Sequence, residues 1–107
     1  MFNKNLPNKS ILEYYKDESS QATEFRRLVK NIRQYGNPLE INSILVTSAA
    51  KHEGKSLIAA NLAIAIAKNE KDKKVLMMDC DLRMPTLHSL FNIERKPGLS
   101  SLLDDNI

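Results

Sequence analysis

The sequence predicts an α/β fold in which helices flank a parallel sheet, and three observations support this prediction. Two short apolar runs, Ile44–Thr47 and Val75–Met78, have the composition of strands that are buried on both faces. Between them lies a loop and then an alanine-rich helix that we expect to start near Lys55. Together these segments form one β-α-β unit with a right-handed crossover. Because two parallel strands are too few for a stable sheet, we expect the fold to be truncated after the second strand.

Two helices are expected before the first strand. The segment Ser10–Glu13 has the spacing of a capping box, so a short helix should run to about Asp17. A longer helix should start at Ser19 or Ser20 and end near Gly36. Its apolar stripe, at helical spacing, consists of Phe25, Leu28, Val29 and Ile32.

Two shorter helical segments are expected after the second strand. Pro85 suits the first position of a helix that should run to about Phe91. A last helical turn is expected at Leu99–Leu103, after the Pro97-Gly98 turn. We therefore divide the chain into a polar N-terminal segment, residues 1–18, and the N-terminal part of one domain, residues 19–107.

The composition is that of an ordinary soluble globular protein, with 42% apolar and 27% charged residues among 107. The net charge is +3 and the basic residues are scattered, so no nucleic-acid partner is expected. One cysteine excludes an internal disulfide and fits a reducing compartment. With neither a signal peptide nor a membrane-length apolar stretch, the chain is predicted to be cytoplasmic.

The loop after the first strand predicts nucleotide binding. Residues 49–56 read A-A-K-H-E-G-K-S, which follows the phosphate-loop pattern G-x-x-x-x-G-K-[ST] except that Ala49 replaces the first glycine. Gly54 would let the backbone approach phosphate without a Cβ. Lys55 would reach the β- and γ-phosphates of ATP, and the Ser56 hydroxyl would bind Mg²⁺. The predicted nucleotide contacts are Lys51, His52, Glu53, Gly54, Lys55, Ser56 and Leu57. For Lys51 and His52 a solvated loop surface is the alternative interpretation.

A pair of carboxylates follows the second strand. Alternation along a strand would place Asp79 and Asp81 on the same side at its carboxyl end, where open α/β sheets bind ligands. One could hold Mg²⁺ and one could accept a proton from an attacking hydroxyl, while Arg83 could bind phosphate or orient a carboxylate. The alternative is an ordinary aspartate turn. Cys80 is expected to be a buried structural residue, and His88 to be packing or surface.

These segments together carry a resemblance. The strings I-L-V-T-S-A-x-x-x-E-G-K-S, K-V-L-x-x-D-x-D-L-R-x-P-x-L-H-x-x-F and G-L-S-x-L-L resemble the bacterial tyrosine kinases of capsule and exopolysaccharide synthesis. That family consists of P-loop NTPases related to the cell-division and partition ATPases. The resemblance runs from about Glu24 to Leu103, and D-L-R-x-P-x-L-H is its most specific part.

The resemblance implies roles for particular residues. Lys55 and Ser56 match the family's Walker A residues, and Asp79 and Asp81 match its Walker A′ motif, which serves Mg²⁺ and catalysis. Glu24, Arg27 and Lys30 match the E-x-x-R-x-x-R element that mediates self-association, with Lys30 in place of the last arginine. The implied partners are tyrosine-containing protein substrates and a membrane adaptor, or chain-length regulator, that recruits the kinase to the inner face of the membrane. The start at Met1 resembles the members whose kinase and adaptor are separate chains.

The sequence also departs from the family. Lys51-His52 replaces the usual Pro-Gly, and the Walker B strand and the tyrosine-rich tail are expected to be absent. The expected function is an ATP-dependent protein-tyrosine autokinase regulating capsular or exopolysaccharide synthesis, or an N-terminal fragment of one. Two alternatives stay open: a non-catalytic remnant that binds nucleotide and assembles, and a regulatory ATPase of the partition type.

Overall fold

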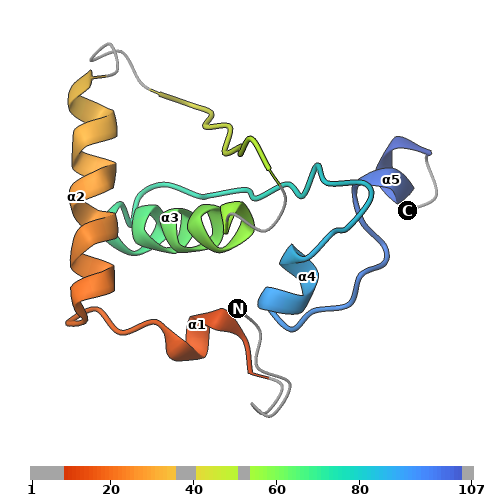
Figure 1. The fold of residues 1–107 in the computed structure, drawn as a ribbon, viewed down its shortest axis with the longest axis horizontal. Coiled ribbons are helices and arrows are strands. Elements are labelled where there is room, and N and C mark those ends of the chain that lie inside the picture. The colour runs from red at the N-terminus through yellow and green to blue at the C-terminus, as the bar shows by residue number, and fades with distance from the viewer. Residues whose placement is uncertain (1–8, 36–40, 51–53, 105–107) are drawn as a thin grey trace. The chain divides into compact units, whose positions relative to one another are not determined.

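The computed structural model describes residues 9–35, 41–50 and 54–104 of the chain. They fall into two compact units, Tyr15–Leu76 and Met1–Tyr14 with Met77–Ile107. The helices shown in Figure 1 are α1 (Ile11–Tyr14), α2 (Ser20–Tyr35), α3 (Lys55–Asn69), α4 (Leu87–Leu90) and α5 (Leu99–Leu103). None of the helices in these described ranges is both long and apolar enough to cross a membrane.

Helix α2 begins where the sequence predicts. The Ser19 side-chain oxygen accepts a hydrogen bond from the Ala22 N–H at 3.0 Å, which satisfies one of the backbone donors that a helix start leaves unpaired. The helix ends at Tyr35. Of its predicted apolar stripe, Val29 is buried, whereas Leu28 is exposed. The predicted bounds of the helix are confirmed, and its buried face is narrower than predicted.

Helix α3 packs against α2, with its carboxyl end toward that helix (Figure 1). The core between them is formed by Val29, Leu62 and Ala65. Partly buried apolar side chains surround it: Phe25, Ile32, Val46 and Ile66. Burying a valine or leucine side chain typically contributes about 1.5–3 kcal/mol, so Val29 and Leu62 stabilise the contact between the two helices.

The predicted parallel sheet is not confirmed, since no strand is present in the described part of the chain. Ile44–Thr47 and Val75–Met78 are strands in neither unit, and the prediction that they are buried on both faces is wrong. Leu45 is 85% exposed and Leu76 is 84% exposed. A strand exists only when its backbone N–H and C=O groups pair with a neighbouring strand, and an apolar run does not supply that partner.

The short helices lie in the other unit. Helix α1 ends at Tyr14, three residues before the predicted end at Asp17. Helix α4 begins at Leu87, two residues after Pro85, so the proline precedes the helix instead of opening it. Helix α5 has the predicted bounds. The local signals therefore locate these helices to within a few residues.

Candidate nucleotide site

The predicted phosphate loop leads into α3, and the residue that precedes the helix is Gly54. It has φ 80° and ψ 17°, in the left-handed region that favours glycine. A Cβ placed on Gly54 would meet no heavy atom within 4 Å. In the structure the glycine is thus explained by its backbone conformation. The close approach of phosphate that the sequence suggests stays a prediction.

Helix α3 begins with two polar residues. Lys55 and Ser56 are its first two residues, and both are half-buried. The Ile58 N–H donates to the Gly54 carbonyl at 3.0 Å, which starts the helix directly after the glycine. The first turn contains no acidic residue, so no side chain of that turn offsets the positive end of the helix dipole. This is the electrostatic arrangement that binds phosphate at helix starts.

The rest of the predicted nucleotide contacts are described only in part. Leu57, in the first turn of α3, has a moderately exposed side chain. Lys51, His52 and Glu53 lie outside the described residues. Just before them, the Ser48 hydroxyl donates to the Ala50 carbonyl at 2.9 Å, so the chain turns at this point. The predicted roles of these loop residues stay predictions.

The first aspartate of the pair, Asp79, closes a loop. Its Oδ1 accepts from the Asp81 N–H at 3.0 Å. Its Oδ2 accepts from the Thr86 N–H at 2.9 Å and from the Leu87 N–H at 3.0 Å. The carboxylate therefore binds the backbone at the start of α4, seven and eight residues further along the chain. We name residues 79–87 the aspartate loop.

The second aspartate makes a local turn. Asp81 Oδ1 accepts from the Arg83 N–H at 3.2 Å and from the Met84 N–H at 3.0 Å. The Arg83 side chain is exposed. Cys80, between the two aspartates, is also exposed, so the prediction that it is buried is wrong. The strand that would have turned it inward is not formed, and the backbone turns at both aspartates instead.

The Walker A residues and the aspartate loop belong to different units. Lys55 and Ser56 are in the unit Tyr15–Leu76, and the aspartate loop is in the other. The geometry of each segment is therefore defined only within its own unit. Their predicted joint use in one nucleotide site remains a prediction.

The donor types in these segments fit Mg²⁺. In nucleotide sites Mg²⁺ is typically held by one or two protein groups together with phosphate oxygens and water. A serine hydroxyl, as in Ser56, and a carboxylate, as in Asp81, are oxygen ligands of this kind. No group of three or more histidine, cysteine, aspartate or glutamate side chains that could hold a metal by themselves occurs within residues 9–35, 41–50 and 54–104. The residues thus fit a metal that arrives with a nucleotide.

The residues predicted to mediate self-association lie on the solvent side of α2. Arg27 Nη1 and Glu24 Oε1 are 3.1 Å apart, and the two side chains are 71% and 68% exposed. Lys30 is exposed as well. All three side chains are accessible to a partner, and their predicted role stays a prediction.

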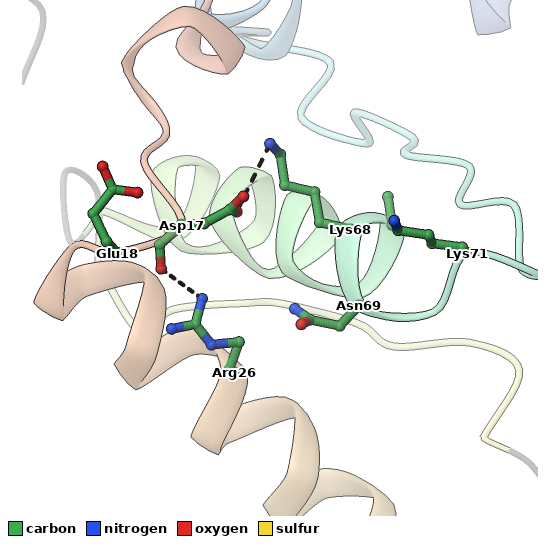
Figure 2. Close-up of a pocket in the computed structure, with 7 residues that line it drawn as sticks. Asp17, Glu18, Arg26, Lys68, Asn69 and Lys71 are labelled. Carbon is green, nitrogen blue, oxygen red and sulfur yellow. Dashed lines mark hydrogen bonds and ion pairs between the residues drawn. The ribbon is translucent and has the colours of Figure 1, made fainter.

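A charged cluster at the junction of α2 and α3 was missed by sequence reasoning (Figure 2). Arg26 donates to the Asp17 carbonyl at 2.8 Å, and the Lys68 ammonium lies 3.8 Å from the Asp17 carboxylate. The same ammonium lies 5.1 Å from the centre of the Tyr15 ring. Three of these side chains and four neighbours line an open pocket: Asp17, Glu18, Arg26, Ala67, Lys68, Asn69 and Lys71.

Tyr15 is the aromatic member of this cluster. Burial raises the pKa of its phenol above the ordinary value of 10.0, although the Arg26 charge opposes the shift. Its hydroxyl oxygen is buried and has no hydrogen-bond partner within the described parts of the chain. No spacing rule links Tyr15 to Lys68, since the contact depends on how α3 packs against the start of α2. The sequence therefore carried no signal for it.

Comparison with known proteins places these segments in context. The sequence model described as the CobQ/CobB/MinD/ParA nucleotide binding domain matches residues 44–104, which include both halves of the site. The tyrosine-protein kinase YwqD of Bacillus subtilis is 37% identical over 95 residues, which are 89% of this chain and 39% of that protein. The putative tyrosine-protein kinase CapB of Staphylococcus aureus is 36% identical over 88 residues, 82% of this chain and 38% of that protein.

A further match covers a smaller share of this chain and of the relative. The tyrosine-protein kinase etk of Escherichia coli K12 is 39% identical over 64 residues, 60% of this chain and 8% of that protein. No solved structure matches the chain with statistical significance. The chain thus spans 39% and 38% of the first two curated relatives, YwqD and CapB.

Proposed function

The chain belongs to the CobQ/CobB/MinD/ParA nucleotide-binding domain family, and on this basis we propose that it binds ATP with Mg²⁺ as part of a protein-tyrosine kinase. The observation that carries the proposal is the start of α3, where a left-handed glycine is followed directly by Lys55 and Ser56. A left-handed glycine, a lysine and a serine at a helix start are the features of a phosphate loop. The kinase assignment draws its support from the names of YwqD, CapB and etk.

In the proposed reaction the tyrosine oxygen attacks the γ-phosphorus of ATP. A new O–P bond forms, the bond to the bridging oxygen of ADP breaks, and the phenolic proton passes to a carboxylate. Lys55 places its charge on the β- and γ-phosphates, and the backbone N–H groups at the start of α3 bind phosphate oxygens. We assign the carboxylate of this step to Asp79 or Asp81, and Arg83 to phosphate or to orienting a carboxylate. When bound, Mg²⁺ would be held by Ser56 and a carboxylate, and it would neutralise part of the phosphate charge.

We extend the proposal to the cellular role. Regulation of capsular or exopolysaccharide synthesis, tyrosine-containing protein substrates and a membrane adaptor follow from the resemblance to the kinases of that process. Self-association is assigned to the exposed face of α2 that carries Glu24, Arg27 and Lys30. The proposed location is the cytoplasm, with recruitment to the inner face of the membrane by the adaptor.

The test of phosphotransfer is incubation of the chain with Mg-ATP, followed by detection of phosphotyrosine. Lys55→Met should reduce the signal by at least about tenfold, since it removes the positive charge that would contact the transferred phosphate. Lys68→Met is the matched control, because Lys68 lies at the far end of the same helix. Equal signal in wild type and Lys55→Met, or no signal in either, would show that the chain does not catalyse the reaction.

A second candidate function is a non-catalytic module that binds nucleotide and assembles. It is favoured by the replacement of the family's usual Pro-Gly by Lys51-His52 in the predicted phosphate loop. Calorimetry with Mg-ADP separates the two functions. Binding without phosphotyrosine formation supports the module. Phosphate release without phosphotyrosine instead supports a regulatory ATPase.

A further inference from the structure

We propose that Tyr35, at the end of α2, is the tyrosine that accepts phosphate when one copy of this chain acts on another. The inference deepens the proposed function by naming a substrate, and it rests on that function for the transfer itself. The sequence has three tyrosines, Tyr14, Tyr15 and Tyr35, so a phosphotyrosine formed on these 107 residues is at one of them. The structure gives the three side chains different access to an incoming ATP.

Tyr15 is the least accessible of the three. Its hydroxyl oxygen is buried, and the Lys68 ammonium lies 5.1 Å from the centre of its ring. Phosphoryl transfer needs the attacking oxygen within about 3–3.5 Å of the phosphorus, in line with the bond that breaks. A triphosphate with its Mg²⁺ cannot come this close to a buried oxygen unless the segment before α2 first opens, and such locally opened states are minor.

Tyr14 is accessible in part, and its sequence neighbours are acidic. It is the last residue of α1 and is 46% exposed. Glu13 directly precedes it, and Asp17 and Glu18 follow within four positions, whereas Lys16 offsets one of these charges. Carboxylates close to the acceptor repel the γ-phosphate of ATP, and they also destabilise the phosphate that would be left on the tyrosine.

Tyr35 combines high exposure with favourable charges. It is the last residue of α2 and is 90% exposed. No acidic residue lies within four positions of it in the sequence, and Arg33 is basic. The dipole of α2 opposes a phosphate at its last residue, but water and salt screen this effect at an exposed helix end. Access and local charge therefore both favour Tyr35 over Tyr14 as the acceptor.

The phosphate must come from a second copy, because Tyr35 and the predicted phosphate site lie at opposite ends of α3. Arg33, in the last turn of α2, donates to Glu70 at 2.7 Å, directly after the last residue of α3. Lys55 is the first residue of the same helix. The ends of a 15-residue helix are about 20 Å apart, which is beyond the reach of a tyrosine side chain. Both ends belong to one compact unit, so ATP bound at Lys55 does not reach the Tyr35 of its own chain.

The transfer between copies is a single displacement at phosphorus. The Tyr35 oxygen of one copy attacks the γ-phosphorus of ATP bound to the other copy. An O–P bond forms, the bond from phosphorus to the bridging oxygen of ADP breaks, and the phenolic proton passes to a carboxylate of the copy that binds ATP. The products are ADP and a phosphate ester on Tyr35.

The test mixes two variants of the full chain with Mg-ATP. Lys55→Met lacks the charge needed for transfer but keeps the acceptor, whereas Tyr35→Phe keeps Lys55 but lacks the acceptor. Trypsin places Tyr35 in the peptide 34–51 and the other two tyrosines in the peptide 10–16, so mass spectrometry separates the sites. Phosphotyrosine on peptide 34–51 should form in the mixture and exceed that of Lys55→Met alone by at least about tenfold, since the mixture supplies an intact Lys55.

The second measurement uses single chains. In the wild type, phosphotyrosine should be found mainly on peptide 34–51. Tyr35→Phe should lower total phosphotyrosine at least about fivefold, because the remaining hydroxyls are less accessible. Tyr14→Phe is the matched control and should change the total by less than about twofold, since it leaves the main acceptor in place.

Access to the three side chains can also be measured without ATP. Nitration by tetranitromethane should modify Tyr35 first and Tyr15 last, in the order of their exposure in the structure. Nitration of Tyr15 as fast as that of Tyr35 would contradict the ranking on which the choice of acceptor depends.

The outcomes separate this inference from the function on which it rests. Phosphotyrosine on peptide 10–16 with none on peptide 34–51 would overturn the choice of Tyr35 and leave the kinase assignment standing. Phosphate on Tyr35 in the wild type but not in the mixture would mean transfer within one chain and would overturn the requirement for a second copy. A wild type without any phosphotyrosine would overturn the proposed function, and this inference with it.

Discussion

Arg33 and Glu70 form a two-bonded ion pair that ties α2 to the end of α3. Arg33 Nε lies 2.7 Å from Glu70 Oε1, and Nη2 lies 2.5 Å from Oε2. The side chains are 31% and 22% exposed, so solvent screens this pair less than it screens Arg27 and Glu24 on the open face of α2. Bidentate geometry and partial burial are the conditions under which an ion pair contributes measurably to stability.

Arg33→Ala should therefore lower the free energy of unfolding by about 1 kcal/mol, measured by urea denaturation. Arg27→Ala is the matched control, since it removes an exposed pair on the same helix and should change stability by less than about 0.5 kcal/mol. Equal losses in the two variants would contradict the view that the Arg33–Glu70 pair stabilises the contact between the helices.

Leu62→Ala should destabilise the chain by about 2–4 kcal/mol, because it opens a cavity in the core that α3 forms with α2. Leu62 is buried beside Val29 and Ala65. Leu76→Ala, at a leucine that is 84% exposed, should cost less than about 0.5 kcal/mol. Thermal unfolding followed by circular dichroism measures both. Similar costs at the two sites would mean that Leu76 is buried in solution, as a sheet would require.

Tyr15→Phe should alter how stability depends on pH. The folded-state pKa of Tyr15 is raised by burial, so the stabilisation it provides is fully present below the unfolded value of about 10. As the pH rises from 10 through the folded pKa, the unfolded chain loses the proton first and stability falls. The variant lacks this loss. Wild-type stability should therefore drop more than that of Tyr15→Phe in urea titrations between pH 9 and about 11.

Tyr35→Phe serves as the control for that experiment. Tyr35 is 90% exposed, so its replacement removes a phenol hydroxyl that the fold does not bury. At neutral pH Tyr15→Phe should be neutral or slightly stabilising, since the hydroxyl that it removes is buried and has no hydrogen-bond partner among the described residues. A loss of more than about 1 kcal/mol at neutral pH would show that the hydroxyl is hydrogen-bonded in solution.

Gly54→Ala should weaken Mg-ADP binding and lower stability by about 1–2 kcal/mol. The added Cβ would meet no heavy atom within 4 Å, so the cost does not come from a clash. It comes from the backbone, because φ is 80° at this position and a residue with a Cβ is strained there. Gly54→Asn should be the milder change, because asparagine adopts the left-handed region more readily. If alanine and asparagine are equally tolerated, the left-handed conformation is not needed for the start of α3.

The sequence by itself determined the helices and the family. Ser19 as a cap and the break after Tyr35 are local signals that locate α2, and Gly54 followed by Lys55 locates the start of α3. Such signals work at short range, because a cap or a left-handed glycine acts on the next few backbone groups. The family followed from motif order, which needs no coordinates.

Only the tertiary structure decided how distant residues are used. The ion pair between Arg33 and Glu70 joins residues that no periodicity relates, because it depends on the packing of α3 against α2. The bonds from Asp79 to the start of α4 likewise depend on the path of the loop. The predicted strands would need neighbouring strands as hydrogen-bonding partners. No strand is present among the described residues, and Leu45 is exposed. Local backbone preferences are encoded residue by residue, whereas pairing and burial are properties of the folded chain.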